Sequence, residues 1–193
     1  MIKIGILGGI GSGKSFVGRS FGYPVFNADD EVSKLYKKEK KIFVKLKKKL
    51  PKHIISFPIN KKEISKAILS SNANLKKIVM TVHPEIQKKL KLFVKKNKDK
   101  KILILDIPLL LENKINRKKD ILIFVSSKKT ETLKRLKKRK NYNNKLLQKF
   151  KNIQLSIDYK KNKSDFIIKN DFTKKTIEKS IKLILNKILL CKR

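Results

Sequence analysis

The stretch of sequence that decides the fold is Gly8-Gly9-Ile10-Gly11-Ser12-Gly13-Lys14-Ser15. It fits the pattern G-x-x-x-x-G-K-[ST], the phosphate-binding P-loop. Before it, the apolar and isoleucine-rich residues 2–7 predict a buried strand. After it, residues 16–21 predict a short helix that ends at Gly22 and Pro24. A strand, a glycine loop and a helix in this order are the structural context that the pattern requires.

Each residue type in this loop suits a phosphorylated ligand. Glycines let the backbone turn so that successive N–H groups point at phosphate oxygens, and the following helix adds its partial positive charge. Lys14 would reach the β- and γ-phosphates, and the Ser15 hydroxyl would bind Mg²⁺. The alternative is a tight glycine turn that binds nothing, which does not account for the Lys-Ser pair or for the flanks.

Length and composition favour one globular domain. The chain has 193 residues, of which 40% are hydrophobic, and this suffices for a sizeable core. No apolar run is long enough to span a bilayer, and the chain starts with a strand, so we expect a cytoplasmic protein without a membrane partner. The single cysteine, Cys191, excludes an internal disulfide.

The net charge of +37 comes mainly from lysine. Lys and Arg number 52, and only five of these are Arg. Nucleic-acid sites draw on Arg for bidentate and stacking contacts, and here the lysines are spread along the whole chain. We therefore expect no specific nucleic-acid binding, although weak, salt-sensitive binding and attraction of polyanionic metabolites follow from the charge.

Acidic residues follow two of the further predicted strands. Apolar segments predict strands over 25–26, 102–105, 121–125 and 166–168. Asp29 follows the first of these and would face the phosphate site, since ligands bind at the carboxyl ends of strands in such sheets. Asp29 could instead cap a helix over 31–36, and Asp29 and Asp30 could divide the two tasks. Asp106 has the place of a Walker B carboxylate, which bonds the Mg²⁺ shell.

The remaining segments predict helices. Residues 31–98 are helical and polar, with breaks at Pro51 and Pro58. His83-Pro84 predicts the start of another helix, and His83 is open to a structural or a functional interpretation. A final amphipathic helix is predicted by the spacing of Ile177, Ile181, Ile184, Leu185 and Ile188.

A basic segment follows the fourth strand. Arg135 and Arg139 are four residues apart and should share a helix face. This segment thus holds two of the five arginines of a lysine-rich chain. Their presence indicates that guanidinium groups are needed here, to contact phosphates and to stabilise charge in the transition state. A solvated basic helix, which would also include Lys140, is the alternative. The polar residues 141–152 could form a mobile cover.

Together these features resemble the dephospho-CoA kinase family, from residue 2 to about residue 185. The matching residues are the P-loop, Ala28-Asp29, His83-Pro84 with Ile86, Pro108-Leu109-Leu110 with Glu112, Arg135, Arg139, Gln154, and Asp165-Phe166-Ile167-Ile168 with Asn170. The chain departs from the family pattern at Asn27 for a common Asp, at Phe16 for a common Thr, and at Lys61 or Lys62 for a usual Arg, and its first helix is about one turn shorter than is usual in the family.

The resemblance implies an α/β fold of the P-loop NTPase class, like that of nucleoside monophosphate kinases. It has a five-stranded parallel sheet flanked by helices, a helical substrate region and a lid. A single kinase domain over 1–193 is expected, divided into a core (1–29, 99–135 and 153–193), a helical CoA-binding insert (about 30–98) and a lid (about 136–152).

The implied reaction is phosphorylation of the ribose 3′-hydroxyl of dephospho-CoA by ATP with Mg²⁺, giving CoA. Catalytic roles fall to Lys14, Asp29 and Arg139. ATP contacts fall to Gly9, Gly11, Ser12, Gly13, Lys14, Ser15, Phe16, Arg135 and Asn170. Dephospho-CoA contacts fall to Asp29, His83, Pro108, Leu109 and Glu112, and metal contacts to Ser15 and Asp106.

Two alternatives stay open at this point. One is another P-loop kinase of small molecules or nucleoside monophosphates, and the other is a basic nucleic-acid-binding protein in which the loop senses nucleotide. In each case we expect a monomer or a small homo-oligomer.

Overall fold

The computed structural model describes residues 1–139 and 142–190, so Lys140, Asn141 and Cys191 lie outside the described residues. The chain forms two compact units. The first, here the core unit, comprises Met1–Asn27, Asn97–Tyr142 and Gln154–Arg193, and the second, here the helical unit, comprises Ala28–Lys96 and Asn143–Ile153. Within the described ranges, no helix combines the length and the apolar character needed to cross a membrane.

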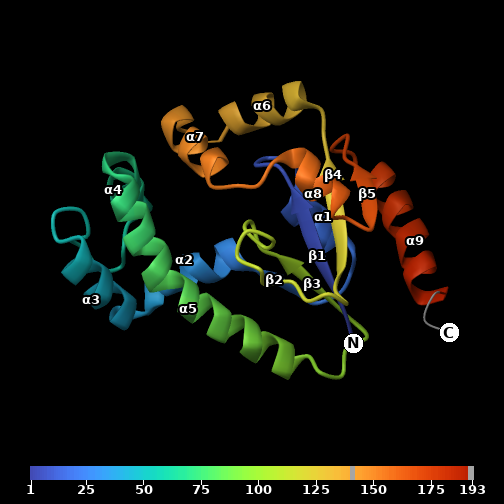
Figure 1. The fold of residues 1–193 in the computed structure, drawn as a ribbon, viewed down its shortest axis with the longest axis horizontal. Helices are drawn as coiled ribbons and strands as arrows, with labels where there is room; N and C mark the ends of the chain where they lie inside the picture. The colour runs from blue at the N-terminus through green and yellow to red at the C-terminus, as the bar shows by residue number, and fades with distance from the viewer. Residues whose placement is uncertain (140–141, 191–193) are drawn as a thin grey trace. The chain divides into compact units, whose positions relative to one another are not determined.

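The core unit is built on a parallel sheet (Figure 1). Its described strands are β1 (Ile2–Gly8), β2 (Val25–Asn27), β3 (Ile102–Asp106), β4 (Ile121–Ser126) and β5 (Phe166–Lys169), in the order β2-β3-β1-β4-β5. All pairs are parallel, and β1 lies between β3 and β4. The central strands are buried on both faces, which is why they are nearly continuous apolar runs. The predicted strands are confirmed, and their carboxyl ends meet at one edge.

Helices pack against this sheet: α1 (Lys14–Ser20) contacts β1, β2 and β3, α8 (Ile157–Asn162) contacts β1, and α9 (Lys174–Leu190) contacts β5. A further helix of the core unit, α6 (Lys129–Lys137), follows β4. Val17 of α1 and Ile177 and Ile181 of α9 join the isoleucines of β1, β3 and β4 in one core cluster. On the other face, a side chain at Gly5 would collide with Leu110, from the loop after β3. The predicted amphipathic helix at the carboxyl end is confirmed as α9.

The helical unit contains the rest of the helices among the described residues. They are α2 (Ala28–Lys38), α3 (Lys40–Lys49), α4 (Lys61–Ser70), α5 (Asn72–Lys96) and α7 (Asn144–Asn152). Helix α5 packs against α2, α3 and α4, and α7 packs against α4. Lys149 Nζ donates to the carbonyl of Ile68 near the end of α4, over 2.9 Å. The predicted breaks at Pro51 and Pro58 are confirmed by the non-helical segment between α3 and α4.

Two predicted helix starts are wrong. Helix α2 begins at Ala28, so Asp29 and Asp30 lie in its first turn, where their charges favour the helix dipole, and neither precedes the helix as a cap. His83-Pro84 lies inside α5 and starts no helix. Buried residues recur at helical spacing on both sides of Pro84, and packing of that continuous apolar face outweighs the loss of one backbone hydrogen bond.

The prediction that Arg135 and Arg139 share a helix face is also wrong. Helix α6 ends at Lys137, and the N–H of Arg139 donates to the carbonyl of Leu136 in a turn that closes the helix. Leu136 is the only buried residue of α6, and residues 137–139 are all basic. Helix α6 therefore ends one residue after Leu136, the last of its side chains that packs against the rest of the core unit.

A matched pair of substitutions on α9 tests this account of the core. Ile181→Ala removes a side chain that is 4% exposed within the cluster, and should lower the free energy of unfolding by about 2–5 kcal/mol. Leu183→Ala removes an isomeric side chain that is 57% exposed, and should change it by less than about 0.5 kcal/mol. Urea unfolding followed by circular dichroism measures both values. Equal losses would contradict the packing of α9 through its isoleucine face.

Candidate active site

The P-loop joins β1 to α1 and holds a conformation that requires glycine. Gly11 and Gly13 have φ angles of 82° and 91°, which side-chain-bearing residues rarely adopt. A Cβ atom on Gly13 would lie 2.2 Å from Nδ2 of Asn170, and one on Gly11 would lie 2.8 Å from Leu136. Ser12 Oγ is buried and has no hydrogen-bond partner among the described residues. A buried hydroxyl without a partner in this loop suits a ligand oxygen.

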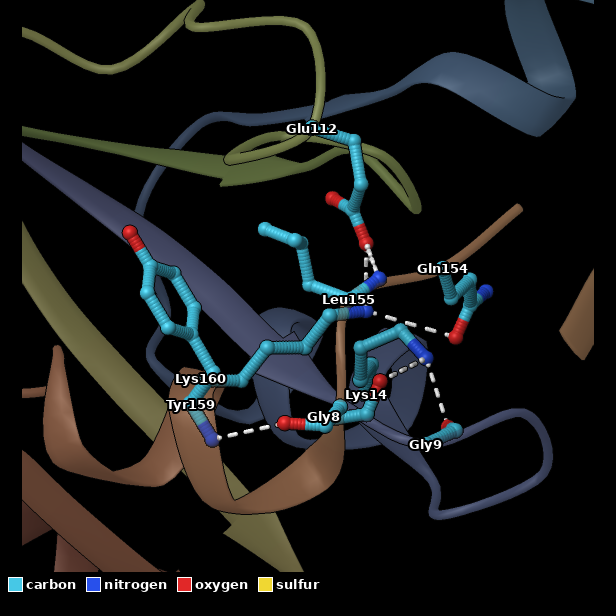
Figure 2. Close-up of polar contacts among 9 residues, drawn as sticks. Gly8, Gly9, Lys14, Glu112, Gln154, Leu155, Tyr159 and Lys160 are labelled. Atoms are coloured by element: carbon cyan, nitrogen blue, oxygen red, sulfur yellow. Dashed lines mark hydrogen bonds and ion pairs between the residues drawn. The ribbon is translucent and has the colours of Figure 1, made fainter. Parts of the chain in front are cut away.

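Lys14 lies across the start of the loop (Figure 2). Its Nζ donates to the carbonyls of Gly8 over 3.2 Å and of Gly9 over 2.8 Å. The loop therefore fixes the direction of the lysine side chain, and the ammonium group lies beside the first glycines of the motif.

Asn170 links the P-loop to the end of β5. Its side chain is 3% exposed, and its Nδ2 donates to the carbonyl of Ser12 over 2.7 Å. Its Oδ1 accepts from the N–H of Phe172 over 2.8 Å. The guanidinium of Arg135 lies 4.4 Å from the centre of the Phe172 ring, a cation–π contact. Two predicted ATP-binding residues, Asn170 and Arg135, thus lie close to the P-loop through one chain of contacts.

Asp171 stabilises the loop that carries Phe172. Its carboxylate accepts hydrogen bonds from the backbone N–H of Thr173 and from the hydroxyls of Thr173 and Thr176. These bonds, the one from the Thr173 backbone first, hold the pKa of Asp171 below its usual range. The carboxylate therefore stays charged at neutral pH and fixes the start of α9.

Ser15, Asn27 and Asp106 form a polar group at the carboxyl ends of β2 and β3. Asn27 Nδ2 donates to Asp106 Oδ2 over 2.5 Å and to Ser15 Oγ over 3.4 Å. Asp106 is 3% exposed. A hydroxyl and a carboxylate are hard oxygen donors that fit Mg²⁺, which keeps several waters and takes its remaining ligands from substrate phosphates. The described residues contain no group of three or more His, Cys, Asp or Glu that could hold a metal without such help.

Glu112 lies in the loop after β3 and pairs with a buried lysine. Its Oε1 lies 2.7 Å from Nζ of Lys160 and accepts from the N–H of Leu155 over 3.0 Å. Figure 2 shows the carboxylate of Glu112 pointing at both donors. Pro108 and Leu109, from the same loop, are half-buried, and the carbonyl of Leu109 accepts from the N–H of Asn113 in its turn.

The remaining predicted residues lie in different places. Asp29 lies in the first turn of α2, and His83 lies in the middle of α5, both in the helical unit. Nε2 of His83 is buried and has no hydrogen-bond partner among the described residues. Phe16, on α1, is 41% exposed. Arg139 follows α6, and the N–H of Tyr142 donates to its carbonyl.

The geometry describes a P-loop on a parallel sheet, with hard oxygen donors beside it. A family model described as dephospho-CoA kinase matches residues 2–176. The chain belongs to the dephospho-CoA kinase family. This confirms the resemblance found in the sequence and the expected enzyme class, a kinase that uses ATP. Neither alternative, another small-molecule kinase or a nucleic-acid-binding protein, is favoured.

Relatives of this kinase family are similar over nearly the whole chain. A dephospho-CoA kinase of Wolbachia pipientis wMel is 36% identical over 192 residues, which are 97% of this chain and 98% of the relative. One of Rickettsia typhi is 33% identical, with 96% and 97% covered. A solved Thermus thermophilus structure has a TM-score of 0.77 at 24% identity, with 96% and 97% covered, and this shows the shared fold.

Three residues of the site were not predicted to act in it. Lys160 is one of many lysines, and no local pattern marks it as buried. Phe172 has a φ of 67°, which is unusual for an aromatic residue, and sequence patterns do not show it. Asn27 was noted only as a departure from the kinase family, although the bond between Asn27 and Asp106 follows from their pairing in register at the ends of β2 and β3.

Two glycines allow a test of the P-loop conformation. Gly13→Ala should cost about 1–2 kcal/mol in backbone strain and force Asn170 away from the loop. The melting temperature of this variant should no longer rise with ATP, as that of the natural chain should. Gly22→Ala is the control, because Gly22 also has a positive φ, of 72°, but open space around it. It should lose similar stability and keep the response to ATP, and equal loss of the response in both would contradict the assignment.

Proposed function

We propose that this chain transfers the γ-phosphoryl group of ATP to the ribose 3′-hydroxyl of dephospho-CoA, giving ADP and CoA. The observation that carries the proposal is the P-loop, with its buried Ser12 hydroxyl, next to Asn27 and Asp106 at the ends of β2 and β3. Phosphoryl transfer relies mainly on positioning and on electrostatic stabilisation, and this arrangement would contribute to both.

The P-loop and its neighbours would bind ATP. Backbone N–H groups of the loop and the start of α1 would hold the phosphates, with Gly9, Gly11, Ser12, Gly13 and Ser15 in contact. Lys14 would lie against the β- and γ-phosphates and offset the charge that develops on the transferred group. Arg135, stacked on Phe172, and Asn170 would form the wall beside the nucleotide, together with Phe16.

Ser15 and Asp106 would hold Mg²⁺, directly or through water. Mg²⁺ held there would supply positive charge to offset the negative charge of the phosphates during the transfer. Asn27 orients the Asp106 carboxylate by donating to Oδ2. Asn at this position, in place of the Asp common in the family, keeps the carboxylate of Asp106 paired without adding a second negative charge next to it.

The acceptor would bind on the helical side. Asp29 lies in the first turn of α2, two residues after Asn27 in the sequence. We assign to Asp29 the role of accepting the proton of the ribose 3′-hydroxyl. As the proton leaves, the ribose 3′-oxygen forms a bond to the γ-phosphorus, and the bond from that phosphorus to the β–γ bridging oxygen breaks, which releases ADP. His83 would donate or accept through Nε2, which has no partner in the described chain, and Pro108 and Leu109 would offer apolar contact.

Arg139 would stabilise the transferring phosphoryl group from the lid side. Its guanidinium is permanently charged and can donate two parallel hydrogen bonds. This bidentate geometry suits the equatorial oxygens of the phosphoryl group better than an ammonium group does. Because Arg139 lies outside α6, the turn after that helix sets its position. We further expect a cytoplasmic protein, a monomer or small homo-oligomer, with no specific nucleic-acid partner.

The direct test is incubation with ATP, Mg²⁺ and dephospho-CoA, with CoA detected by mass. CoA should appear, and Lys14→Ala should lower kcat about a hundred- to a thousandfold through lost stabilisation of the phosphoryl group. Lys179→Ala, at an exposed position of α9, removes the same charge elsewhere and should leave kcat unchanged. Absence of CoA from the natural chain, under conditions where a known kinase of this family works, would refute the proposal, and a panel of other acceptors would then identify another kinase activity.

Substitution of the acceptor-side carboxylate tests its role. Asp29→Asn should lower kcat by about two orders of magnitude or more, since the amide cannot accept the hydroxyl proton. Asp30→Asn is the matched control, because Asp30 is the next residue in the first turn of α2 and makes the same contribution to the helix dipole. Steady-state kinetics with saturating substrates measures both. A near-normal kcat for Asp29→Asn would remove Asp29 from the mechanism.

A further inference from the structure

Lys160 differs from every other lysine whose side chain the structure describes. The chain has 52 Lys and Arg residues, yet Lys160, which is 2% exposed, is the only one among the buried residues of the described chain. Burial of a lysine is rare unless the ammonium group is paired, because desolvation of the charge is costly. Its position in the short helix α8 therefore needs a specific explanation.

The ammonium group has two partners from different segments (Figure 2). Glu112 Oε1, in the loop after β3, lies 2.7 Å from Nζ, and Gln154 Oε1 accepts from Nζ over 3.3 Å. The same oxygen of Glu112 also accepts from the N–H of Leu155. The lysine thus holds the carboxylate, and the carboxylate holds the backbone at Leu155.

Stability alone does not explain this pair. Replacement of a buried ion pair by apolar residues is often neutral or stabilising, because the desolvation of two charges offsets their attraction. The exposed Lys–Glu pairs of this chain contribute little to stability for a different reason, because water screens the attraction between their charges. A buried pair that also binds a backbone N–H has a geometric effect that an apolar pair cannot reproduce.

The backbone that Glu112 holds lies where the chain returns to the core unit. Residues 143–153, with α7, belong to the helical unit, and Gln154 is the first residue of the core unit after them. Leu155 is therefore three residues past the end of α7. Helix α8 follows at once and packs against β1, and a side chain at Gly9 of the P-loop would lie 3.7 Å from Ile157 of this helix.

We propose that Glu112 is a positioning residue that fixes the root of the lid at Leu155, and that Lys160 and Gln154 hold its carboxylate in place. This rests on the proposed function, in which the lid supplies Arg139 to the transferring phosphoryl group. Because α8 also contacts the P-loop, the backbone at Leu155 and the phosphate site keep a fixed position relative to each other within the core unit. Glu112 then aligns the lid through the backbone, with its Oε1 engaged by two protein donors. This role replaces the dephospho-CoA contact that the family resemblance implies for Glu112.

Three variants separate alignment from burial of charge. Lys160→Met leaves the Glu112 carboxylate without its cation, so it should turn to water and release Leu155; kcat should fall about tenfold. The double variant Lys160→Met with Glu112→Gln has no unpaired charge and keeps an acceptor for the N–H of Leu155, so its kcat should return to within about threefold of the natural value. The double variant Lys160→Met with Glu112→Leu lacks both the charge and the acceptor, so its kcat should stay low. Lys161→Met, at the exposed neighbouring position, is the control for loss of a lysine.

Two measurements accompany the kinetics. Thermal melting shows whether each variant is folded, and the two double variants stay comparable even if Lys160→Met alone does not fold, because neither buries an unpaired charge. Amide hydrogen exchange of the peptide spanning 153–160 should be about tenfold faster with Leu at position 112 than with Gln, and unchanged in β1. This arm needs no activity.

The outcomes test the proposed function and the positioning role of Glu112 separately. Failure of the natural chain to make CoA refutes the proposed function, and the exchange experiment then still decides whether Glu112 holds Leu155. Equal kcat and equal exchange with Gln and with Leu at position 112 would overturn the positioning role, since only the charge would then matter. A natural kcat for Lys160→Met would overturn it as well.

Discussion

The hydrogen bond from the Asn170 amide to the Ser12 carbonyl is the contact on which the rest of the site depends. A loop that turns its N–H groups inward must turn carbonyl oxygens outward, and a buried carbonyl has to find a donor. Asn170 supplies that donor from the end of β5, and its own oxygen fixes Phe172, on which Arg135 stacks. The absence of a side chain at Gly13 is what lets the amide approach. The shape of the phosphate site and the place of the arginine are therefore set together.

The parallel sheet explains why residues distant in the sequence can act on one phosphate. Strands β1, β2, β3 and β5 end at Gly8, Asn27, Asp106 and Lys169, and parallel pairing brings these ends to the same edge. The register pairs Asn27 with Asp106, so the amide and the carboxylate meet without any contribution from flexible loops. Groups held on strand ends need little reorganisation, which is the property that electrostatic stabilisation of a transferring phosphoryl group requires.

The sequence predicted those features that a local pattern determines, and failed where distant packing decides. The P-loop, the five strands and the apolar face of α9 each follow from residues within one segment. The continuity of α5 through Pro84 and the end of α6 before Arg139 depend on what lies against those helices, which no local window contains. Lys160 is the clearest case, since among so many lysines nothing in its neighbourhood distinguishes the one that is buried.

The scarcity of acidic residues makes their positions informative. Against 52 basic residues the chain has 15 carboxylates, so random surface pairing would use all of them on lysines. Several bind backbone N–H groups at places where the chain turns or changes unit, and Glu112 does so while it also pairs with Lys160. Asp165 accepts from Leu122 at the start of β4, Asp171 from Thr173 at the start of α9, and Glu112 from Leu155 after α7. A carboxylate bound to a fixed N–H specifies one backbone position, whereas a solvated lysine pair specifies none. In a lysine-rich chain, the carboxylates bound to backbone therefore determine where the segments of the active site are held.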